Sequence, residues 1–424
     1  MTDHSPAQPG ETLLILGAGL VGSAAAVTFA RRGFKVTLMD RDLPGSGASH
    51  GNAGGIVPSA SPLAQPGLPF DVPKMLFDPL GPLSLKPLQA IKSFPWFLRF
   101  LKECSAARAE ENSIALYALT RDAAPAWKEL VRGTPAESLL RDVGWLKVYS
   151  SEDGFRNHAP ERDFLTRRGA PLELLSQDEL RRMEPNLAKF FVRAMWQPDG
   201  LFVRNPRRLC EIMAETARVL GAAVLQEQAT DLAVQPDGRV VVATDRAIHR
   251  PDRVMICAGA YSKRFAKQLG AAPMLVAERG YHAMFDVPEK GLERPVFWVE
   301  NSMVLCPMEH GMRLTTQSEF ADIDAPPDFR RLERLVAEAG RMLPGLDTTI
   351  RDRWMGRRPS TPDSLPYLGP APATPRAYFN FGHNHLGLTL SAVSARRAAD
   401  AWMDAWTGRN DHSSHDLSKY RALR

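Results

Sequence analysis

The chain has 424 residues, of which 44% are hydrophobic and 24% charged, a composition typical of a globular protein and not of a disordered or fibrous one. Its length exceeds what one hydrophobic core usually organises, so we expect two or three domains. The net charge of +5 comes from Lys and Arg residues that are scattered in runs no longer than two, which argues against a nucleic-acid-binding protein.

The cysteines and the N-terminus bear on the cellular compartment. Cys104, Cys210, Cys257 and Cys306 lie far apart and include no CxxC pair, so neither a zinc site nor a disulfide framework is indicated. We expect reduced core cysteines and no bound metal. The first eleven residues lack a basic start followed by an apolar run, and no apolar stretch reaches the roughly 18 residues of a membrane span. These features predict a cytoplasmic protein.

The first predicted element is a buried strand over residues 12 to 17, because an apolar run that ends at a glycine is typical of a parallel strand covered on both faces. A GxGxxG motif follows, and small residues from 23 onward open a helix that we expect to end near Gly33. A second strand over residues 34 to 39 leads to an acidic residue. The candidate nucleotide-binding residues of this unit are Gly17, Gly19, Leu20, Val21, Gly22, Asp40 and Arg41.

Each part of this βαβ unit has a role in binding a dinucleotide. Gly17 permits the tight turn, Gly19 lets the backbone approach the pyrophosphate, and Gly22 allows close packing of the helix whose N-terminus faces the anion. The carboxylate of Asp40 can accept hydrogen bonds from ribose hydroxyls. The unit therefore predicts a dinucleotide-binding domain, and it leaves both NAD and FAD open.

The loop after the second strand, SHGNAGGIVP over residues 49 to 58, resembles that of the D-amino acid oxidase-like flavoproteins, especially the small-subunit type of bacterial D-amino acid dehydrogenase. Glycines and an asparagine there supply backbone NH groups without side-chain obstruction, as a polyanion beside a flat ring requires. The resemblance implies that the cofactor is FAD. It implies cofactor contacts from Ser49, His50, Gly51, Asn52, Ala53, Gly54 and Gly55.

Further blocks carry the same resemblance along nearly the whole chain. Residues 251 to 259 resemble the strand that ends close to the flavin, and residues 225 to 232 resemble the strand that meets the adenine. Residues 354 to 363 resemble the G-x-R-P-x-T-P-D block, and residues 382 to 389 resemble the closing flavin loop. The additional FAD-binding residues that this implies are Ala229, Ala258, Gly259, Arg358, Gly382, His383, Asn384, His385, Leu386, Gly387, Leu388 and Thr389. A helix predicted from Thr389 to about Trp406 would direct its positive end at the part of the flavin that becomes negative on reduction.

The resemblance also implies the chemistry of the second half of the protein. A hydride moves from the substrate α-carbon to flavin N5, so the protein chiefly orients the substrate and excludes water. The substrate carboxylate requires a cation that can bind both its oxygens, and Arg313 is the implied arginine. Tyr281 is a second candidate for contact with the substrate, and His282 could accept the amine proton. His383 and His385 are further catalytic candidates, and the sequence leaves open which of them faces the flavin.

Residues 66 to 103 are rich in proline and in large apolar side chains, with little helical periodicity before about residue 88. A long apolar loop must be covered or must face something apolar. We expect it to form a lid over the substrate entrance. The alternative is a surface that touches the inner face of the membrane, where a quinone or a partner would accept electrons. Lys86, Lys92, Arg99 and Lys102 would suit anionic head groups there.

The fold class that we predict is α/β, with a Rossmann-like FAD-binding domain and an α+β substrate-binding domain on a mostly antiparallel sheet. Amphipathic helices are predicted over residues 108 to 131 and 328 to 342, and strands over residues 143 to 149, 297 to 306 and 312 to 316. The ranges assigned to the discontinuous FAD-binding domain are 10–60, 195–275 and 350–410. The ranges assigned to the substrate-binding domain are 61–194 and 276–349, and 411–424 form a polar tail.

The predicted function is FAD-dependent oxidative deamination of a D-amino acid, including D-proline or a hydroxy-D-proline, with electrons passed to a quinone or another acceptor. The nearest alternative is a glycine or sarcosine type of oxidase that uses oxygen, since the same carboxylate clamp would serve it. An alternative of another class is a flavin-binding subunit of a multi-protein electron-transfer complex. The preference for a dehydrogenase rests on the resemblance alone.

Overall fold

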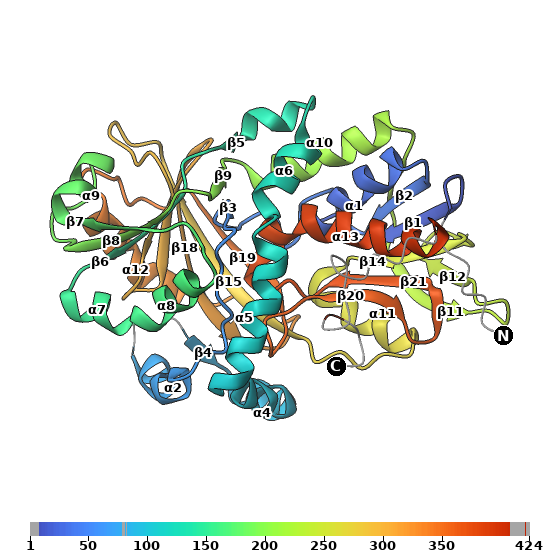
Figure 1. The fold of residues 1–424 in the computed structure, drawn as a ribbon, viewed down its shortest axis with the longest axis horizontal. Helices are drawn as coiled ribbons and strands as arrows, with labels where there is room; N and C mark the ends of the chain where they lie inside the picture. Colours follow the sequence, from blue (N-terminus) through green and yellow to red (C-terminus); the bar gives the residue numbers. More distant parts are fainter. Residues whose placement is uncertain (1–7, 79–80, 82, 408–419, 421–424) are drawn as a thin grey trace.

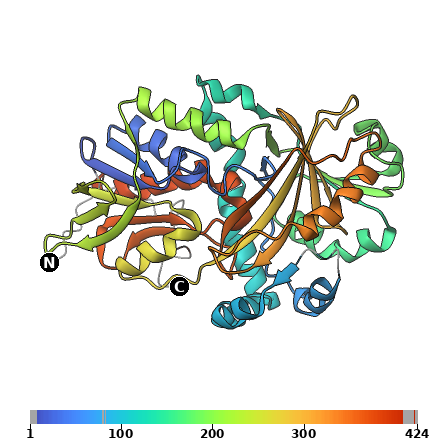
Figure 2. The same cartoon turned by 180° about the vertical axis from the view of Figure 1, so that it is seen from behind.

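The computed structural model describes residues 8–78, 81, 83–407 and 420. Two large sheets lie side by side, and helix α5 (Ala106–Thr120) runs along the boundary between them (Figure 1). The view from behind shows the same two-part arrangement (Figure 2). The predicted α/β fold with a second, mostly antiparallel sheet is confirmed.

The first sheet has six strands in the order β10-β2-β1-β14-β21-β20. Their bounds are β1 (Thr12–Leu16), β2 (Lys35–Asp40), β10 (Ala223–Gln226), β14 (Arg253–Ile256), β20 (Tyr367–Ala371) and β21 (Thr374–Phe381). Neighbouring strands are parallel except at the edge, where β20 is antiparallel to β21. The loops after the parallel strands therefore meet at one edge, which is where such sheets bind nucleotides.

Layers on both faces bury this sheet, which explains its continuous apolar strands. One face carries α1 (Leu20–Arg31), α10 (Pro206–Val219) and α13 (Gly387–Thr407), and α5 and α6 (Ala123–Val131) pack against α13. The other face carries α11 (Ser262–Gln268) and a small sheet of β11 (Ala229–Val234), β12 (Val240–Thr244) and β13 (Ile248–His249).

The second sheet has nine strands, in the order β19-β15-β18-β17-β16-β6-β8-β7 with β4 paired to β18. Their bounds are β4 (Leu83–Leu85), β6 (Trp145–Tyr149), β7 (Glu173–Ser176), β8 (Arg193–Gln197), β15 (Val276–Phe285), β16 (Val296–Trp298), β17 (Met303–Met308), β18 (Gly311–Phe320) and β19 (Asp352–Ser360). Among the described strand pairs of this sheet, β16–β6 and β18–β4 are parallel and the others are antiparallel.

Shorter elements complete this half of the molecule. The helices are α2 (Leu68–Phe77), α3 (Pro87–Lys92), α4 (Phe94–Glu103), α7 (Glu152–Asn157), α8 (Ala159–Arg167), α9 (Gln177–Met183), α12 (Arg330–Met342) and the 3-10 turn η1 (Pro135–Leu139). A small sheet of β3 (Gly55–Ile56), β9 (Leu201–Val203) and β5 (Leu140–Arg141) lies between the two halves in Figure 1.

The two faces of the nine-stranded sheet have different environments, because side chains alternate along each strand. On β15, Tyr281, Ala283 and Phe285 are buried against α12 in one apolar cluster. The side chains between them point the other way, and His282 contacts the carbonyl oxygen of Gly51 in the first half of the protein. We call this second face the inner face.

Most predicted elements are confirmed, and three need correction. Residues 225 to 232 form two strands and not one, because β10 pairs with β2 and β11 pairs with β12. Residues 108 to 131 form two helices, because Pro125 has no NH to donate to the carbonyl of Arg121 and the helix must restart. Residues 297 to 306 likewise form two strands joined by a turn.

The segment 66 to 103 was expected to be a loop before residue 88, and that expectation is wrong. Helix α2 contains Pro73, while α3 and α4 carry a proline in the first turn, where a missing NH costs no hydrogen bond. The prolines of α3 and α4 therefore mark helix starts, whereas Pro73 lies within α2.

The assigned domain ranges remain a proposal. Strand β19 lies in the nine-stranded sheet although 350–410 was assigned to the FAD domain, and helices α5 and α6 pack on α13 although 61–194 was assigned to the substrate domain. The proposed tail, 411–424, lies outside the described residues except for Tyr420, whose hydroxyl donates to the carbonyl of Ala115 (2.6 Å).

Candidate active site

The glycine-rich turn lies where β1, β2 and β14 end. Gly17 has a φ of +108°, and a Cβ atom there would lie 2.5 Å from the carbonyl oxygen of Cys257. A Cβ atom on Gly22 would lie 1.7 Å from the carbonyl oxygen of Gly17. Both positions therefore require glycine. The turn holds the N-terminus of α1 at the edge of the sheet, where its partial positive charge suits a pyrophosphate.

Asp40, at the end of β2, braces the same turn. Its carboxylate accepts hydrogen bonds from the backbone NH groups of Ala18 (2.7 Å) and Asp42 (3.1 Å). Burial raises the pKa of Asp40 despite these bonds. The guanidinium of Arg41 lies 4.4 Å from the ring centroid of Tyr261. Ribose binding by Asp40 stays a prediction.

The predicted adenine contact lies beside Asp40. The backbone NH of Glu227 donates to the carbonyl oxygen of Asp40 (2.9 Å), and Ala229 begins β11 two residues further on. The structure thus brings Ala229 to the same edge of the sheet as the glycine-rich turn, although the two are about 200 residues apart in the chain.

The loop of residues 49 to 55 folds on itself and closes over the start of α1. Ser49 Oγ accepts a hydrogen bond from the NH of Leu20 (3.0 Å), and the Asn52 amide donates to the carbonyl of Ser49 (2.8 Å). The NH of Gly54 donates to Asn52 Oδ1 (2.8 Å). A Cβ atom on Gly55 would lie 2.5 Å from the ring of Trp145, so glycine lets the loop approach the inner face.

Arg313 anchors this loop to the inner face. Its Nη1 donates to the carbonyl oxygens of His50 (3.2 Å) and Asn52 (2.9 Å), and the side chain is buried. Burial lowers the pKa of Arg313 to about 10, which leaves it protonated at neutral pH. The geometry favours a role in shaping the flavin loop over the expected role as the clamp for a substrate carboxylate.

His282 faces the same loop from β15. Its Nδ1 lies 3.2 Å from the carbonyl oxygen of Gly51, and its ring stacks on Trp354. Burial, together with the charge of Arg313, lowers the pKa of His282 to about 3, so the imidazole is neutral. His50, His282 and Asp352 bring one ligand atom each within 4.8 Å of one another. The positive charge of Arg313 beside both histidines opposes a cation at this cluster.

Two loops from the six-stranded sheet complete the site, namely 258–261, with the 3-10 turn η2 (Gly259–Tyr261), and 382–389, with η3 (Asn384–Leu386). Both contact strand β19. Asn384 adopts a φ of +51° and its side chain accepts a hydrogen bond from the NH of Thr361 (2.8 Å). The hydroxyl of Thr389 accepts from the NH of Val57 (3.1 Å). The predicted helix that follows is confirmed as α13, which begins at Gly387.

The two histidines of the closing loop differ in their surroundings. His383 is buried, and its Nε2 lies 3.2 Å from Ser394 Oγ on α13. His385 is exposed although protein surrounds it closely enough for burial to lower its pKa to about 4. Of the two, His385 is the one whose side chain a bound molecule could reach.

Arg358 lies on the inner face of β19, near the closing flavin loop. Its Nη1 donates to Glu278 Oε1 (2.8 Å), and its charge reaches His385. Burial would raise the pKa of Glu278, but Arg358 and the hydroxyls of Ser318 and Ser360 outweigh it and hold the pKa below its usual range. The pair is an ionised arginine and carboxylate beside the closing flavin loop.

A glycine pair forms the floor between Arg358 and Trp354. Gly280 and Gly356 are opposite each other on β15 and β19. A Cβ atom on Gly280 would lie 2.2 Å from Arg358 Nη2, and one on Gly356 would lie 2.0 Å from the ring of Trp354. The absence of side chains there lets the guanidinium and the indole lie flat against the sheet.

Tyr281 points away from this region. Its hydroxyl donates to Glu319, accepts from Arg279 (3.2 Å), and its ring packs edge-on against Phe329. All of these partners lie on the face covered by α12. The expectation that Tyr281 contacts the substrate therefore finds no support in the geometry.

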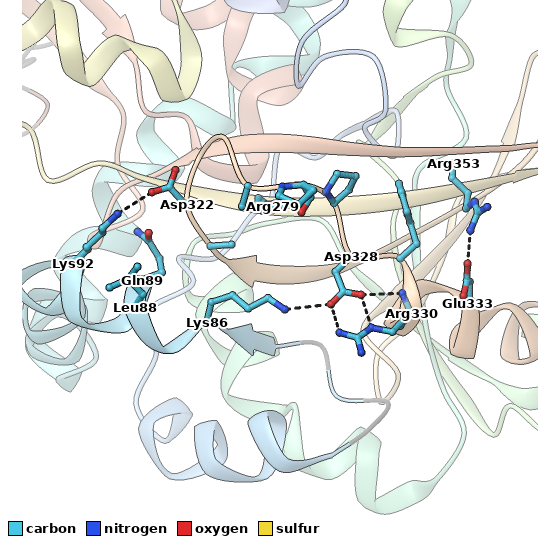
Figure 3. A pocket seen from close by; sticks show the side chains of 15 residues that line it. Lys86, Leu88, Gln89, Lys92, Arg279, Asp322, Asp328, Arg330, Glu333 and Arg353 are labelled. Carbon is cyan, nitrogen blue, oxygen red and sulfur yellow. Dashed lines mark hydrogen bonds and ion pairs between the residues drawn. The ribbon is translucent and has the colours of Figure 1, made fainter.

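A surface hollow of about 730 Å³ also lies on that outer side, near α3 and the start of α12 (Figure 3). Its charged side chains form ion pairs, with Lys86 and Arg330 on Asp328 and with Lys92 on Asp322. The nine-stranded sheet separates this hollow from the glycine-rich turn and the flavin loops. We therefore place the active site on the inner face.

The arrangement fits a bound dinucleotide whose ring reaches the inner face. Cβ atoms added to Gly259 or Gly387 would meet no atom within 4 Å, so both loops border open space. A pyrophosphate at α1, an adenosine beside Asp40 and Ala229, and a ring beside His385 would occupy one continuous edge of the sheet. The fold and the site are those of a dinucleotide-binding protein with a second domain built on an antiparallel sheet.

Comparison with known proteins shows the family. The model of the DAO family, FAD dependent oxidoreductase, matches residues 12–401, and the chain belongs to this family. The cofactor is therefore FAD. A D-amino-acid oxidase of Bradyrhizobium diazoefficiens is 32% identical over 398 residues, which cover 92% of this chain and 94% of that protein.

Solved structures show the same fold. Glycine oxidase from Geobacillus kaustophilus superposes with a TM-score of 0.73 at 23% identity, covering 98% of this chain and 99% of that chain. L-proline dehydrogenase from P. horikoshii has a TM-score of 0.73 at 16% identity, covering 99% and 98% respectively.

Several site residues were missed from the sequence. Glu278 and Gly280 line the inner face but stand in no predicted motif, and Trp354 and Gly356 lie in the block 354 to 363 but were not among the predicted site residues. The alternation of charged and small residues in β15 could have placed Glu278, Gly280 and His282 on one face of a strand. Arg358 was predicted as a flavin contact only.

Proposed function

We propose that the protein oxidises the carbon–nitrogen bond of an amino acid, with a D-amino acid as the substrate. The observation that carries the proposal is the ionised Arg358 on the inner face, beside His385 of the closing flavin loop. A guanidinium can hold both oxygens of a substrate carboxylate. The 32% identity to a D-amino-acid oxidase supports the D configuration.

The proposed reaction requires little acid or base from the protein. FAD supplies the chemistry by accepting two electrons and a hydrogen from the substrate. Arg358 orients the carboxylate, while Glu278 fixes the guanidinium and the glycine pair leaves room above the sheet. His385 is neutral at physiological pH, so it can accept a hydrogen bond from a substrate amine without repelling a cation. The two halves of the protein together exclude water.

The product would be an imino acid that water hydrolyses to a 2-oxo acid and ammonia, or a pyrroline if the substrate is a cyclic D-proline. Oxidation of glycine or sarcosine is the alternative reaction for the same clamp.

The test is a screen of D- and L-amino acids, glycine and sarcosine, with oxygen or an artificial dye as acceptor. Turnover of D-amino acids with the dye alone supports a dehydrogenase, and hydrogen peroxide formation supports an oxidase. Turnover of L-amino acids alone contradicts the proposed configuration.

We also propose that helices α2 to α4 touch the cytoplasmic face of a membrane that holds the electron acceptor. Large apolar side chains gather there at the surface, and Phe70 and Phe77 are each 87% exposed. The others are Leu88, Ile91, Phe94, Leu98 and Leu101. No described helix is long and apolar enough to cross a bilayer. Insertion of this patch into the interface, beside the exposed Lys102, is the mode that we propose.

Sedimentation with vesicles of phosphatidylglycerol and phosphatidylcholine tests this second proposal. The wild-type protein should sediment with the vesicles, and a Phe70→Ser/Phe77→Ser variant should remain in the supernatant with its flavin content intact. The matched control replaces Val219 and Val287, two exposed valines elsewhere on the surface, with serine and should bind as the wild type does. If the wild-type protein does not sediment with anionic vesicles, the proposed membrane contact is wrong.

A further inference from the structure

Three successive cross-strand pairs of β15 and β19 lie on the inner face, because every second residue of a strand shares one face of the sheet. The pairs, in order along the strands, are Glu278–Arg358, Gly280–Gly356 and His282–Trp354. The first is an ion pair, the second has no side chains, and the third is a pair of stacked rings with centroids 5.2 Å apart. The inner face therefore passes from a charged end to an aromatic end across a bare floor.

The charged end and the aromatic end are close enough for one amino acid to contact both. A Cβ atom on Gly280 would lie 2.2 Å from Arg358 Nη2, and one on Gly356 would lie 2.0 Å from Trp354 Cη2. Because the Cβ positions of directly opposite residues are about 5 Å apart, the guanidinium and the indole are separated by less than about 10 Å. A carboxylate bound to the guanidinium fills part of this gap, and the side chain of the same amino acid spans the rest.

Trp354 is held in position by its contacts with His282 and the flavin loop. Its ring stacks on His282, and a Cβ atom on Gly51 would lie 2.0 Å from Trp354 Cε3. His282 is fixed in turn, because its Nδ1 lies 3.2 Å from the carbonyl oxygen of Gly51. The indole nevertheless stays half-buried. A partly exposed aromatic ring beside a small-molecule site is a surface that an apolar group of the ligand can cover.

The charged groups around the aromatic end are already engaged. Arg313 donates to two backbone carbonyl oxygens of the flavin loop, and Glu278 is paired with Arg358. Asp352 lies 3.9 Å from His282 Nε2, but its side chain is 61% exposed, so water screens its charge. A polar side chain of the substrate would therefore lose its hydration at this end and gain no matched partner, which costs free energy.

Resting on the proposed function, we propose that Trp354, with His282 behind it, forms the subsite for the substrate side chain, and that this subsite takes an aromatic or a large aliphatic group. Arg358 holds the carboxylate, the glycine pair leaves room for the α-carbon, and the indole covers the side chain. An apolar side chain gains free energy by leaving water for the indole, whereas a carboxamide of the same shape gives up its hydrogen bonds to water. Glycine has no side chain with which to contact Trp354.

Substrates of matched shape test the subsite without any mutation. Because leucine and asparagine have nearly the same shape, kcat/KM for D-leucine should exceed that for D-asparagine by about tenfold or more. The kcat/KM for D-phenylalanine should likewise exceed the values for D-alanine and glycine. The same comparison with the L-enantiomers covers the case that the enzyme acts on amino acids of the other configuration. An enzyme that oxidises D-asparagine as efficiently as D-leucine, or that prefers glycine, overturns the subsite alone.

A Trp354→Gln variant should bring the leucine-to-asparagine ratio close to one, whereas Trp354→Phe keeps an aromatic face and should keep most of the preference. Because the indole also packs against the flavin loop, both variants are assayed at saturating FAD. The matched control is Trp196→Gln, which changes a half-buried tryptophan packed on the α12 side of the sheet and should keep the wild-type ratio. A flavin-loaded Trp354→Gln variant with an unchanged ratio overturns the subsite. A protein that oxidises no amino acid overturns the proposed function, and the subsite with it.

Discussion

Replacement of Arg313 by methionine separates two roles that an arginine could have at this site. In the folded protein, Arg313 Nη1 donates to the carbonyl oxygens of His50 at 3.2 Å and Asn52 at 2.9 Å. Methionine fills a similar volume but donates no hydrogen bond. The substitution therefore removes the anchors of the flavin loop and leaves two carbonyl groups of a partly buried loop without these donors.

The free energy lost in the Arg313→Met variant can be estimated because the donor is charged. A hydrogen bond to a charged group contributes about 1.5 to 3 kcal/mol. Loss of both hydrogen bonds from Arg313 should therefore destabilise the FAD-binding conformation of the loop by about 3 kcal/mol. At 1.4 kcal/mol per tenfold change, the dissociation constant of FAD should rise about 100-fold. The Michaelis constant for the amino acid should change little in the fraction that retains FAD, because the side chain does not hold the carboxylate.

The assay is the flavin-to-protein ratio after gel filtration, followed by a titration of the apoprotein with FAD and by steady-state kinetics at saturating FAD. Arg358→Met is the matched control, and it should stay yellow while its Michaelis constant rises steeply. If Arg313→Met instead stays fully loaded with FAD and its Michaelis constant rises, Arg313 is the carboxylate ligand and the loop-anchoring argument is refuted.

Three further predictions concern the flavin site and stability. Gly22→Ala should purify without flavin because its Cβ atom would lie 1.7 Å from a backbone oxygen of the turn; a variant that purifies fully loaded with FAD would contradict this. Burial holds the pKa values of His282 and His383 at about 3, below the ordinary 6.5, so the unfolded chain binds more protons between these values and stability should fall as the pH falls, by about 1 kcal/mol per histidine from pH 6.5 to 5.5 in urea unfolding. His383→Gln should flatten that dependence, and an unchanged slope would exclude its contribution. Trp127→Phe should lower the free energy of unfolding by about 1 to 2 kcal/mol, because the indole NH donates at 2.7 Å to a backbone carbonyl of the closing flavin loop; a loss below about 0.5 kcal/mol would speak against this bond.

The sequence predicts the nucleotide-binding half well because its signals are local. The apolar strand before Gly17, the three glycines and the acid at Asp40 each act within about 30 residues of chain, and the structure keeps them together. The helix after the closing flavin loop is equally clear, since its run of small and apolar residues is long. These elements can be predicted without any knowledge of contacts between distant parts of the chain.

Predicting the substrate-binding residues requires knowing which face of the nine-stranded sheet is covered by helices. Alternation places Arg279 and Tyr281 on one face of β15 and His282 on the other, but only the packing of α12, some 50 residues later, makes the Tyr281 face the outer one. The role of Arg313 is equally non-local, because its partners are backbone carbonyls about 260 residues away. Sequence motifs contain no information on the packing of α12 against β15 or on the hydrogen bonds of Arg313.

We infer that this single chain binds FAD and that an amino acid reduces the bound flavin. The most direct measurement is the visible spectrum of the purified protein, recorded without oxygen as D-amino acids are added. We expect a yellow protein whose flavin band at about 450 nm bleaches with the stoichiometry of one substrate per FAD, with no partner present. A colourless protein, or a flavin band that no amino acid of either hand bleaches, would contradict it.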